Sequence, residues 1–127
     1  MSEQKLSSSV QAETVENRSD TLNQLIEIIR SAKLPKREEQ AEQLFLENMR
    51  NNKIDVEPIS TKRGFKIYLV EIDDKRYAVW LRAKPVSREA LEMTEKILKN
   101  YEIDGKILVK LVRKADYVKI HGWIKLT

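Results

Sequence analysis

The sequence of 127 residues predicts one domain of the α/β (α+β) class, with a mixed central sheet of about five strands and helices packed on it. Three segments carry apolar residues at helical spacing, two of them before residue 52 and one after residue 87. Between and after these segments lie strand-like runs that are separated by turn residues. The predicted order of elements is therefore α-α-β-β-β-α-β-β.

The start of the chain differs in composition from the rest. Residues 1–18 are mostly Ser, Gln, Glu and Asn, so ordering them would cost backbone entropy with little apolar surface to bury. We expect them to be a disordered tail, followed by a single α/β domain over residues 19–127. The polar start also lacks the hydrophobic stretch of a secretory signal, and no apolar run approaches the roughly 18 residues needed to cross a bilayer. A soluble cytoplasmic protein without a membrane partner is expected.

Two helices precede the predicted sheet. The first is expected to have Ser19 or Asp20 as its N-cap and to end before Pro35. Its apolar face would be formed by Leu22, Leu25, Ile26 and Ile29. The second helix is expected to begin at Pro35, which suits a first turn, and to stop at Asn51 and Asn52. Its buried stripe would be Ala41, Leu44, Phe45 and Met49.

A meander of three strands is expected after the second helix. Strand-like runs cover residues 53–59, 65–72 and 75–83. Asp73 and Asp74 lie between the last two runs and have the composition of a tight hairpin turn. Consecutive strands joined by such short connections pair with one another, so these three strands should form one antiparallel unit.

A third helix and two further strands complete the prediction. Ser87 is expected to cap the helix. The residues at helical spacing are Ala90, Leu91, Thr94, Ile97, Leu98 and Tyr101. Asp104-Gly105 then ends the connection into the apolar run 107–112. The stretch 116–126 is expected to be the last strand, joined to the run before it by a hairpin turn.

The composition excludes several kinds of site. The chain has no Cys and one His, which excludes a disulfide framework, a thiolate metal site and a zinc cluster built on histidines. Charged residues make up 35% of the chain, and it has only three Gly and three Pro. Such a composition is common in proteins from hot environments, where ion-pair networks are favoured, and it points to a thermophile. We expect no metal and no cofactor.

The positive charge is concentrated in the predicted strands. Residues 60–84 hold seven Lys or Arg against three acids, and residues 105–127 hold six against one, which gives net charges of +4 and +5. The chain as a whole carries +4, so the remainder carries −5. A basic sheet beside a mildly acidic helical part is the kind of asymmetry that attracts a polyanion. The sequence therefore favours a module that faces nucleic acid over a small-molecule enzyme.

The predicted last strand alternates between two kinds of side chain. Its even positions are Val118, Ile120, Gly122, Ile124 and Leu126, and its odd positions are Tyr117, Lys119, His121, Trp123 and Lys125. Aromatic rings and cations on one face of a strand can stack bases and hold phosphates. Ordinary packing of the rings beneath a helix, with Lys protecting a sheet edge, is the competing interpretation.

Further cations lie in and near the predicted turns. Lys62, Arg63 and Lys66 surround Gly64 and could hold phosphates, although solvated loop charge is the alternative. With Lys75, Arg76 and Lys106 they belong to a distributed positive field, which would give salt-sensitive affinity rather than sequence choice. The candidate residues for nucleic-acid binding are Lys62, Arg63, Lys66, Arg82, Lys84, Lys110, Arg113, Lys114, Tyr117, Lys119, His121, Trp123 and Lys125.

Few residues suggest catalysis. His121 is the sole histidine, and no Ser or carboxylate is placed by a motif to make it a general base. Glu71, Asp73 and Asp74 cluster at a hairpin, where they could bind a divalent ion, but Asp also favours turns through its own backbone bonds. No catalytic residue is predicted from the sequence pattern.

The element order of residues 36–127 resembles the restriction-endonuclease-like fold of the PD-(D/E)xK nucleases. That family has an acid on the second strand and a Glu-x-Lys on the third, and the carboxylates hold metal ions that activate water. In this sequence the third strand reads Val79-Trp80-Leu81-Arg82-Ala83-Lys84. Trp80 stands at the family's Glu and Arg82 at its Lys, so the resemblance implies that the metal-binding pair is lost.

Within that fold the C-terminal domain of archaeal tRNA-splicing endonucleases is more similar still. The similar segments are Phe65–Tyr68, Arg76–Val79 and Tyr117–Leu126. That family cleaves RNA without metal through Tyr, His and Lys. Of these residues only Tyr68 matches, because Asp74 lies near the expected histidine and Asp104 or Gly105 near the lysine. The resemblance implies a non-catalytic relative, comparable to structural subunits that pair with active ones.

Three functions are consistent with the sequence, and we rank them in the following order. The first is a non-catalytic module or accessory subunit of a nucleic-acid-processing complex, which binds RNA or DNA phosphates through the basic sheet face. The second is a protein-interaction subunit, which docks on a larger protein or on a second copy through an edge strand or through the apolar face of Leu22–Ile29. The third is a divergent nuclease with rearranged acids such as Glu42, Glu71 and Asp73, which would require a divalent metal ion.

Overall fold

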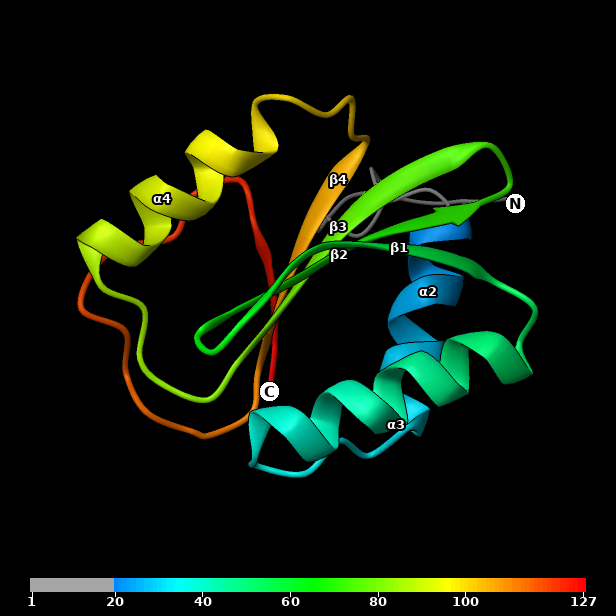
Figure 1. Ribbon diagram of the computed structural model, residues 1–127, viewed down its shortest axis with the longest axis horizontal. Coiled ribbons are helices and arrows are strands. Elements are labelled where there is room, and N and C mark those ends of the chain that lie inside the picture. The colour runs from blue at the N-terminus through cyan, green and yellow to red at the C-terminus, as the bar shows by residue number, and fades with distance from the viewer. Residues whose placement is uncertain (1–19) are drawn as a thin grey trace, which may run out of the picture.

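A five-stranded mixed sheet with helices on both faces forms the computed structural model, which describes residues 20–127 (Figure 1). The helices are α2 (Asp20–Ser31), α3 (Glu38–Asn51) and α4 (Arg88–Leu98). The strands are β1 (Asp55–Lys62), β2 (Phe65–Ile72), β3 (Lys75–Arg82), β4 (Gly105–Lys110) and β5 (Ile124–Leu126). The predicted class and order of elements are therefore confirmed. The disordered tail predicted for residues 1–18 lies outside the described residues.

The strands lie in the sheet in their order along the chain. The first three form the predicted antiparallel meander, whereas β4 pairs parallel to β3 and β5 pairs parallel to β4. The prediction of a final hairpin is therefore wrong, because two parallel neighbours need a crossover between them. Residues 111–123 make that crossover without a helix. β2 begins at the same end of the sheet at which β3, β4 and β5 end.

The last strand is much shorter than the sequence pattern predicted. Residues 116–123 are not part of the sheet, and a turn at His121-Gly122 directs the chain into β5. Gly122 has φ 81°, a left-handed conformation that glycine adopts at little cost. Val118 and Ile120 pack on the α4 side of the sheet, whereas Ile124 packs on the opposite side. The apolar side chains at the even positions are thus turned inward as expected, but toward two different cores, and Gly122 between them is exposed.

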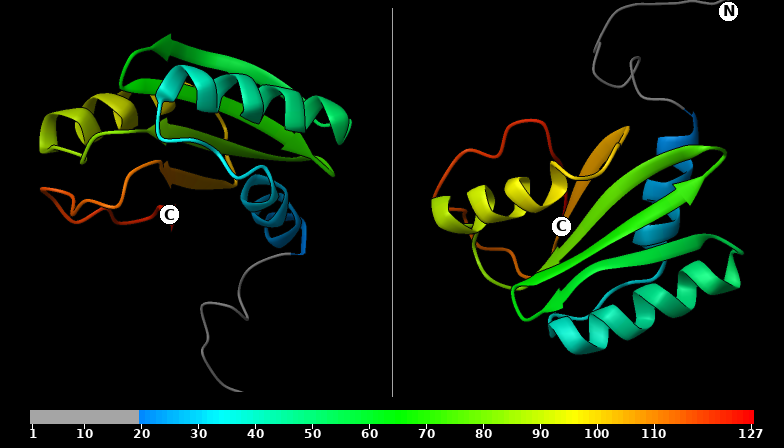
Figure 2. Two further views of the ribbon diagram at one scale, coloured as in Figure 1. Left: turned by 90° about the horizontal axis from the view of Figure 1, so that it is seen from below. Right: turned by 45° about the horizontal axis from the view of Figure 1, so that its top comes forward.

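The two faces of the sheet are covered by different helices (Figure 2). Tyr68 and Val70 of β2 point toward α2 and α3, whereas Ile67, the residue before Tyr68, points toward α4. The apolar face predicted for the first helix, Leu22–Ile29, is buried in the first of these cores. The sequence interpretation of that face as a docking surface is therefore wrong.

Some helix boundaries and stripe positions differ from the prediction. α3 begins at Glu38 rather than at Pro35, because Arg37 at its N-cap has extended backbone with φ −87° and ψ 132°. Leu44, which was expected in the buried stripe of this helix, is 41% exposed. The cap of α4 is as predicted, since the Ser87 hydroxyl accepts a hydrogen bond from Ala90 N–H at 3.1 Å.

The two hairpin turns place opposite charges at opposite ends of the sheet. Arg63-Gly64 joins β1 to β2, and Gly64 has φ 84°. Asp73-Asp74 joins β2 to β3 as predicted, and both residues have positive φ, at 52° and 64°. Two successive residues with positive φ are typical of a type I′ turn, whose twist matches that of a hairpin. The length of β2, about 23 Å at 3.3 Å per step, separates the two turns.

Candidate nucleic-acid interface

Exposed cations gather at the end of the sheet where β3, β4 and β5 terminate. They come from the end of α2, the α2–α3 connection, the β1–β2 turn, the β3–α4 connection and the segment after β4. We call this set the basic rim; its members are Arg30, Lys33, Lys36, Arg37, Arg63, Lys84, Arg113 and Lys114. In open α/β sheets, ligands bind outside the carboxyl ends of the parallel strands. The basic rim lies at this position.

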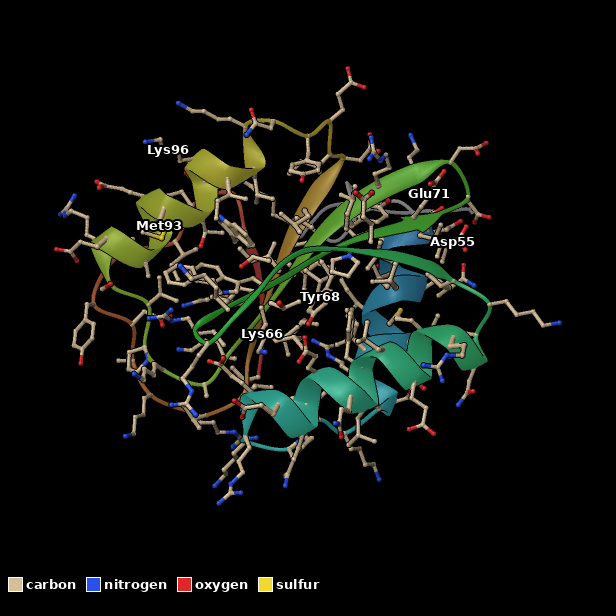
Figure 3. The ribbon with its side chains drawn as sticks, viewed as in Figure 1. Asp55, Lys66, Tyr68, Glu71, Met93 and Lys96 are labelled. Carbon is tan, nitrogen blue, oxygen red and sulfur yellow. The ribbon has the colours of Figure 1, made fainter. Side chains whose placement is uncertain are left out.

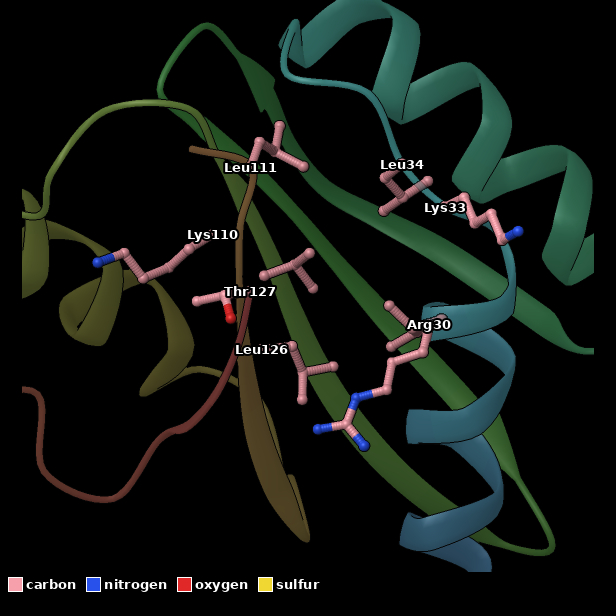
Figure 4. A pocket seen from close by; sticks show the side chains of 9 residues that line it. Arg30, Lys33, Leu34, Lys110, Leu111, Leu126 and Thr127 are labelled. Carbon is pink, nitrogen blue, oxygen red and sulfur yellow. The ribbon is translucent and has the colours of Figure 1, made fainter. Parts of the chain in front are cut away.

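Three adjoining hollows lie between the members of the basic rim. Their volumes are about 280, 540 and 440 Å³. Lys36 lines the second and third hollows, and Lys110 lines the first and third, so the three form one continuous surface. Figure 4 shows the first hollow, where Leu34, Leu111 and Leu126 contribute apolar side chains and Arg30 lies at one edge. The surface thus offers shallow apolar floors with cations at their edges.

Few free carboxylates oppose these cations. Glu38 is 6% exposed and accepts hydrogen bonds from the backbone N–H groups of Gly64 at 2.7 Å and Ala83 at 3.2 Å. Glu39 is exposed beside Arg63, with 3.7 Å between their side chains. A backbone hydrogen bond, aided by Arg63 and by Lys66, lowers the pKa of Glu39. The Glu38 carboxylate is therefore occupied by backbone N–H groups of the rim, and the remaining exposed charge there is mainly positive.

Five of the cations predicted to bind nucleic acid are exposed at this end of the sheet. Arg63, Lys84, Arg113 and Lys114 belong to the basic rim, and Lys62 lies next to Arg63 at the end of β1. The structure therefore brings together residues that are up to 52 positions apart in the sequence, from Lys62 to Lys114. Their binding of nucleic acid stays a prediction.

Arg82 is a support of the rim rather than a member of it. Its guanidinium donates hydrogen bonds to the carbonyl oxygens of Gly64 at 2.9 Å, Lys84 at 3.2 Å and Pro85 at 3.1 Å. It also lies over the rings of Phe65 and Trp80. Burial lowers the pKa of Arg82, and the Glu38 and Asp116 carboxylates act in the opposite direction. The side chain ties the β1–β2 turn to the β3–α4 connection.

Lys110 is likewise bonded within the protein. Its ammonium group lies 3.0 Å from the Asp116 carboxylate and also donates to the carbonyl oxygen of Lys114. Figure 4 shows that the Lys110 side chain points away from the first hollow. The Asp116 side chain is 2% exposed and accepts a further hydrogen bond from Val86 N–H at 2.9 Å. Lys110 therefore fixes the segment that carries Arg113 and Lys114.

Lys66 is buried in a polar cluster between β2 and α3 (Figure 3). Its ammonium donates to Glu42 at 3.1 Å and to the Thr61 carbonyl oxygen at 2.7 Å. The Tyr68 hydroxyl donates to the other oxygen of Glu42. Burial, together with the hydrogen bond to Glu42, raises the pKa of Tyr68 far above its ordinary value. Tyr68 is thus a buried phenol whose hydroxyl is bonded within the protein.

The predicted aromatic face of the last strand is not formed. Trp123 is 7% exposed, and its indole N–H donates to Glu95 of α4 at 2.9 Å. Its ring lies 5.5 Å from that of Trp80, and the Lys106 ammonium lies over it. The packing interpretation is therefore confirmed for Trp123. The other four candidates from that stretch are exposed but do not share a strand face: Tyr117, Lys119, His121 and Lys125.

Half of the basic rim was missed by the sequence interpretation. Arg30, Lys33, Lys36 and Arg37 were counted with the acidic helical remainder, but they belong to the end of α2 and to the connection that follows it. The signal in the sequence is the run of cations from Lys33 to Arg37 around Pro35. That run does not reveal which end of the sheet the connection crosses, because this depends on the packing of α2 and α3.

At the opposite end of the sheet, acidic residues outnumber the one cation, Lys53, that lines the same hollow. Asp55, Glu71, Asp73 and Asp74 line a hollow of about 430 Å³ there, and Figure 3 shows Asp55 and Glu71 at this end. Glu42 lies against Lys66, five residues along β2 from Glu71, or about 16 Å. The rearranged catalytic set of Glu42, Glu71 and Asp73 is therefore not assembled.

The part of the chain that the structure describes holds no group of three or more His, Asp or Glu side chains placed to bind a metal ion. Among α2, α3 and α4, no helix has the length and apolar character required to cross a lipid bilayer. Comparisons of the chain with models of known protein families, with curated proteins and with solved structures found no match.

Proposed function

We propose that the basic rim binds the phosphate groups of nucleic acid and that the protein acts as a non-catalytic module or accessory subunit in nucleic-acid processing. The observation that carries this proposal is the convergence of eight exposed cations on one end of the sheet, from the end of α2 and from four separate connections. Three further cations, Lys66, Arg82 and Lys110, are bonded to groups inside the protein and are therefore not members of the rim. An array of this kind suits a ligand with repeated negative charge.

Separate observations support the proposal that the protein is not catalytic. The three polar side chains that lie together between β2 and α3 satisfy one another, and Tyr68 is neutral and buried. Trp80 and Arg82, the residues that stand at the positions of the nuclease motif, face α4, whereas Lys66 and Tyr68 face α3. We also propose that the protein is a relative of the restriction-endonuclease-like proteins. In this relative, the polar cluster of Lys66, Glu42 and Tyr68 would stabilise the fold.

A fluorescence-anisotropy titration with labelled DNA and RNA oligonucleotides tests the proposal. We expect log affinity to fall linearly with log salt, with a slope of about −3 for four phosphate contacts on a single strand, at roughly 0.7 per contact. A shallow slope, or no binding at 50 mM salt, would contradict the role of the rim.

A pair of charge-reversed variants locates the contacts. Lys84→Glu with Lys114→Glu changes two exposed members of the rim, and we expect weaker binding to every sequence and a slope shallower by about 1.4. The matched control is Lys75→Glu with Lys96→Glu, which changes the net charge equally at two exposed positions outside the rim. If both double variants lost the same affinity, net charge and not the rim would determine binding.

A further inference from the structure

One aromatic side chain in the segment that carries Arg113 and Lys114 is largely exposed. Tyr117 is 76% exposed, more than the other large exposed hydrophobic residues of the described chain, Met93 at 51% and Leu44 at 41%. A ring in water contributes little to the stability of the fold, because it buries little apolar surface. The side chain of Tyr117 therefore calls for an explanation outside the packing of the protein.

The backbone beneath this ring is held firmly. Tyr117 N–H donates to the Val86 carbonyl oxygen at 3.0 Å, and Val86 N–H donates to the Asp116 carboxylate at 2.9 Å. The same carboxylate accepts from Lys110 of β4 at 3.0 Å and from Lys125 of β5 at 3.4 Å. Asp116 and Tyr117 are thus tied to the β3–α4 connection and to two strands. An exposed ring on a fixed backbone is preorganised to bind, since little further ordering is needed.

The anchors of Tyr117 also hold the basic rim. Val86 lies two residues after Lys84, and Asp116 lies two residues after Lys114. Lys110 bonds at once to the Asp116 carboxylate and to the Lys114 carbonyl oxygen, so the ring and the rim cation share one support. The Tyr117 backbone is therefore fixed three residues along the chain from the rim cation Lys114.

We propose that Tyr117 is a stacking platform for an unpaired base, and that the ligand of the basic rim is single-stranded. The inference rests on the proposed function. Aromatic side chains bind single strands by stacking on bases, which every base allows because each has a π face. The bases of a duplex are stacked on one another and do not offer that face to a surface residue. Cations on the rim would hold the backbone, while Tyr117 selects for bases that are not paired.

The test compares single-stranded DNA and RNA of one sequence with the corresponding duplexes, using the full chain. Tyr117→Ala should weaken single-strand binding about tenfold or more, as expected for the loss of one stacked base. Duplex binding and the salt slope should be unchanged, because no phosphate contact is removed. Tyr117→Trp should restore single-strand affinity. The preference between the DNA and RNA strands identifies the natural source of the base.

Two readouts separate stacking from damage to the fold. A 2-aminopurine base in the oligonucleotide should lose fluorescence on binding to the wild type but not to Tyr117→Ala. Leu44→Ala, which also truncates an exposed apolar side chain, serves as the matched control and should change neither affinity nor quenching. The thermal midpoint of Tyr117→Ala should equal that of the wild type.

The outcomes distinguish this inference from the proposed function. If Lys84→Glu with Lys114→Glu abolished binding while Tyr117→Ala bound single strands as well as the wild type, the rim would stand and the platform would be refuted. Equal loss on single strands and duplexes would also refute it. If the wild type bound no nucleic acid at low salt, both proposals would fail, and the exposed ring would belong to a protein interface.

Discussion

The two ends of the sheet are built from similar hairpins but carry opposite charge. At one end the Arg63-Gly64 turn lies among the cations of the basic rim, and at the other the Asp73-Asp74 turn lies among carboxylates. The ends also differ in how they are held. The Arg63-Gly64 turn accepts and donates buried hydrogen bonds with Glu38, Arg82 and Trp80. At the acidic end, the turn is joined to the rest of the chain by an exposed contact between Thr21 and Asp73.

This difference agrees with the proposal that the basic end is the one that binds a ligand. A surface whose charges must keep a fixed arrangement needs supports, and two of the three supports at the basic end, Glu38 and Arg82, are charged groups removed from solvent. At the acidic end, the turn conformation alone explains the two Asp residues, which tolerate positive φ better than most side chains. The charge separation therefore runs along the strands, and is not a separation between sheet and helices.

Removal of the buried carboxylate at the basic end should have the largest effect. Glu38→Ala leaves two backbone N–H groups without an acceptor and removes an anion near Arg82, so we expect a loss of roughly 2–4 kcal/mol in the free energy of unfolding. Urea titration measures it. Glu39→Ala is the adjacent control, because its exposed ion pair should be worth less than about 1 kcal/mol. Equal losses in the two variants would mean that Glu38 is no support.

The second prediction concerns Asp116, the anchor beneath Tyr117. Burial alone would raise the pKa of Asp116, but the hydrogen bond from Val86 N–H and the Lys110 ammonium outweigh it, and the pKa lies below its ordinary value. A carboxyl group with a lower pKa in the folded state stabilises the protein above its unfolded pKa of about 3.9. That stability is lost as the pH falls through the lower, folded value.

Asp116→Asn should therefore reduce the free energy of unfolding at pH 7 by about 1–3 kcal/mol, since buried charge-assisted hydrogen bonds are lost. Its stability should also decline less than that of the wild type between pH 5 and pH 3, as measured by urea unfolding at each pH. Asp104→Asn provides a comparison, because Asp104 accepts one hydrogen bond from Arg76 N–H at an exposed site. Parallel pH profiles for wild type and Asp116→Asn would contradict the role of this carboxylate.

The fold was largely predictable because local signals agree with the final structure. β2 has the predicted bounds, Asp73-Asp74 forms the predicted turn, and Ser87 caps α4. Periodicity failed over residues 116–123, where Asp116 bonds to Val86, 30 positions away, and holds the chain outside the sheet. A period of two shows that alternate residues turn inward, but it does not show that they face the same core.

The candidate site was predictable only in part, since exposure depends on contacts distant in sequence. Lys66 and Lys84 look alike in the sequence, but Lys66 meets Glu42, 24 positions away, whereas Lys84 is exposed. Arg82 is held by Gly64, 18 positions away. Hence the charge count identified a basic protein, and the packing of α2 and α3 decided which cations form the rim.

The third prediction compares the two turns directly. Gly64→Ala places a side chain at φ 84° and brings Cβ to 3.4 Å from the Arg82 guanidinium, so we expect a loss of about 1 kcal/mol or more. Asp74→Gly relieves positive φ at the other end and should be neutral or stabilise the fold by up to about 1 kcal/mol. Thermal unfolding of both variants measures the contrast. A destabilised Asp74→Gly would show that the acidic turn has supports of its own.

The smallest effect is expected when charges at the acidic end are removed and the affinity for nucleic acid is measured. Asp73→Asn with Asp74→Asn removes two negative charges about 23 Å along β2 from the rim. At 0.15 M salt the Debye length is about 8 Å, so the affinity for a short single strand should change less than about twofold. At 0.01 M salt, where the Debye length is about 30 Å, the same variant should bind more tightly. Anisotropy titrations at both concentrations check this. An increase in affinity that persists at 0.15 M salt would show that the ligand extends along the sheet to the acidic turn, since only a nearby phosphate would respond to those charges.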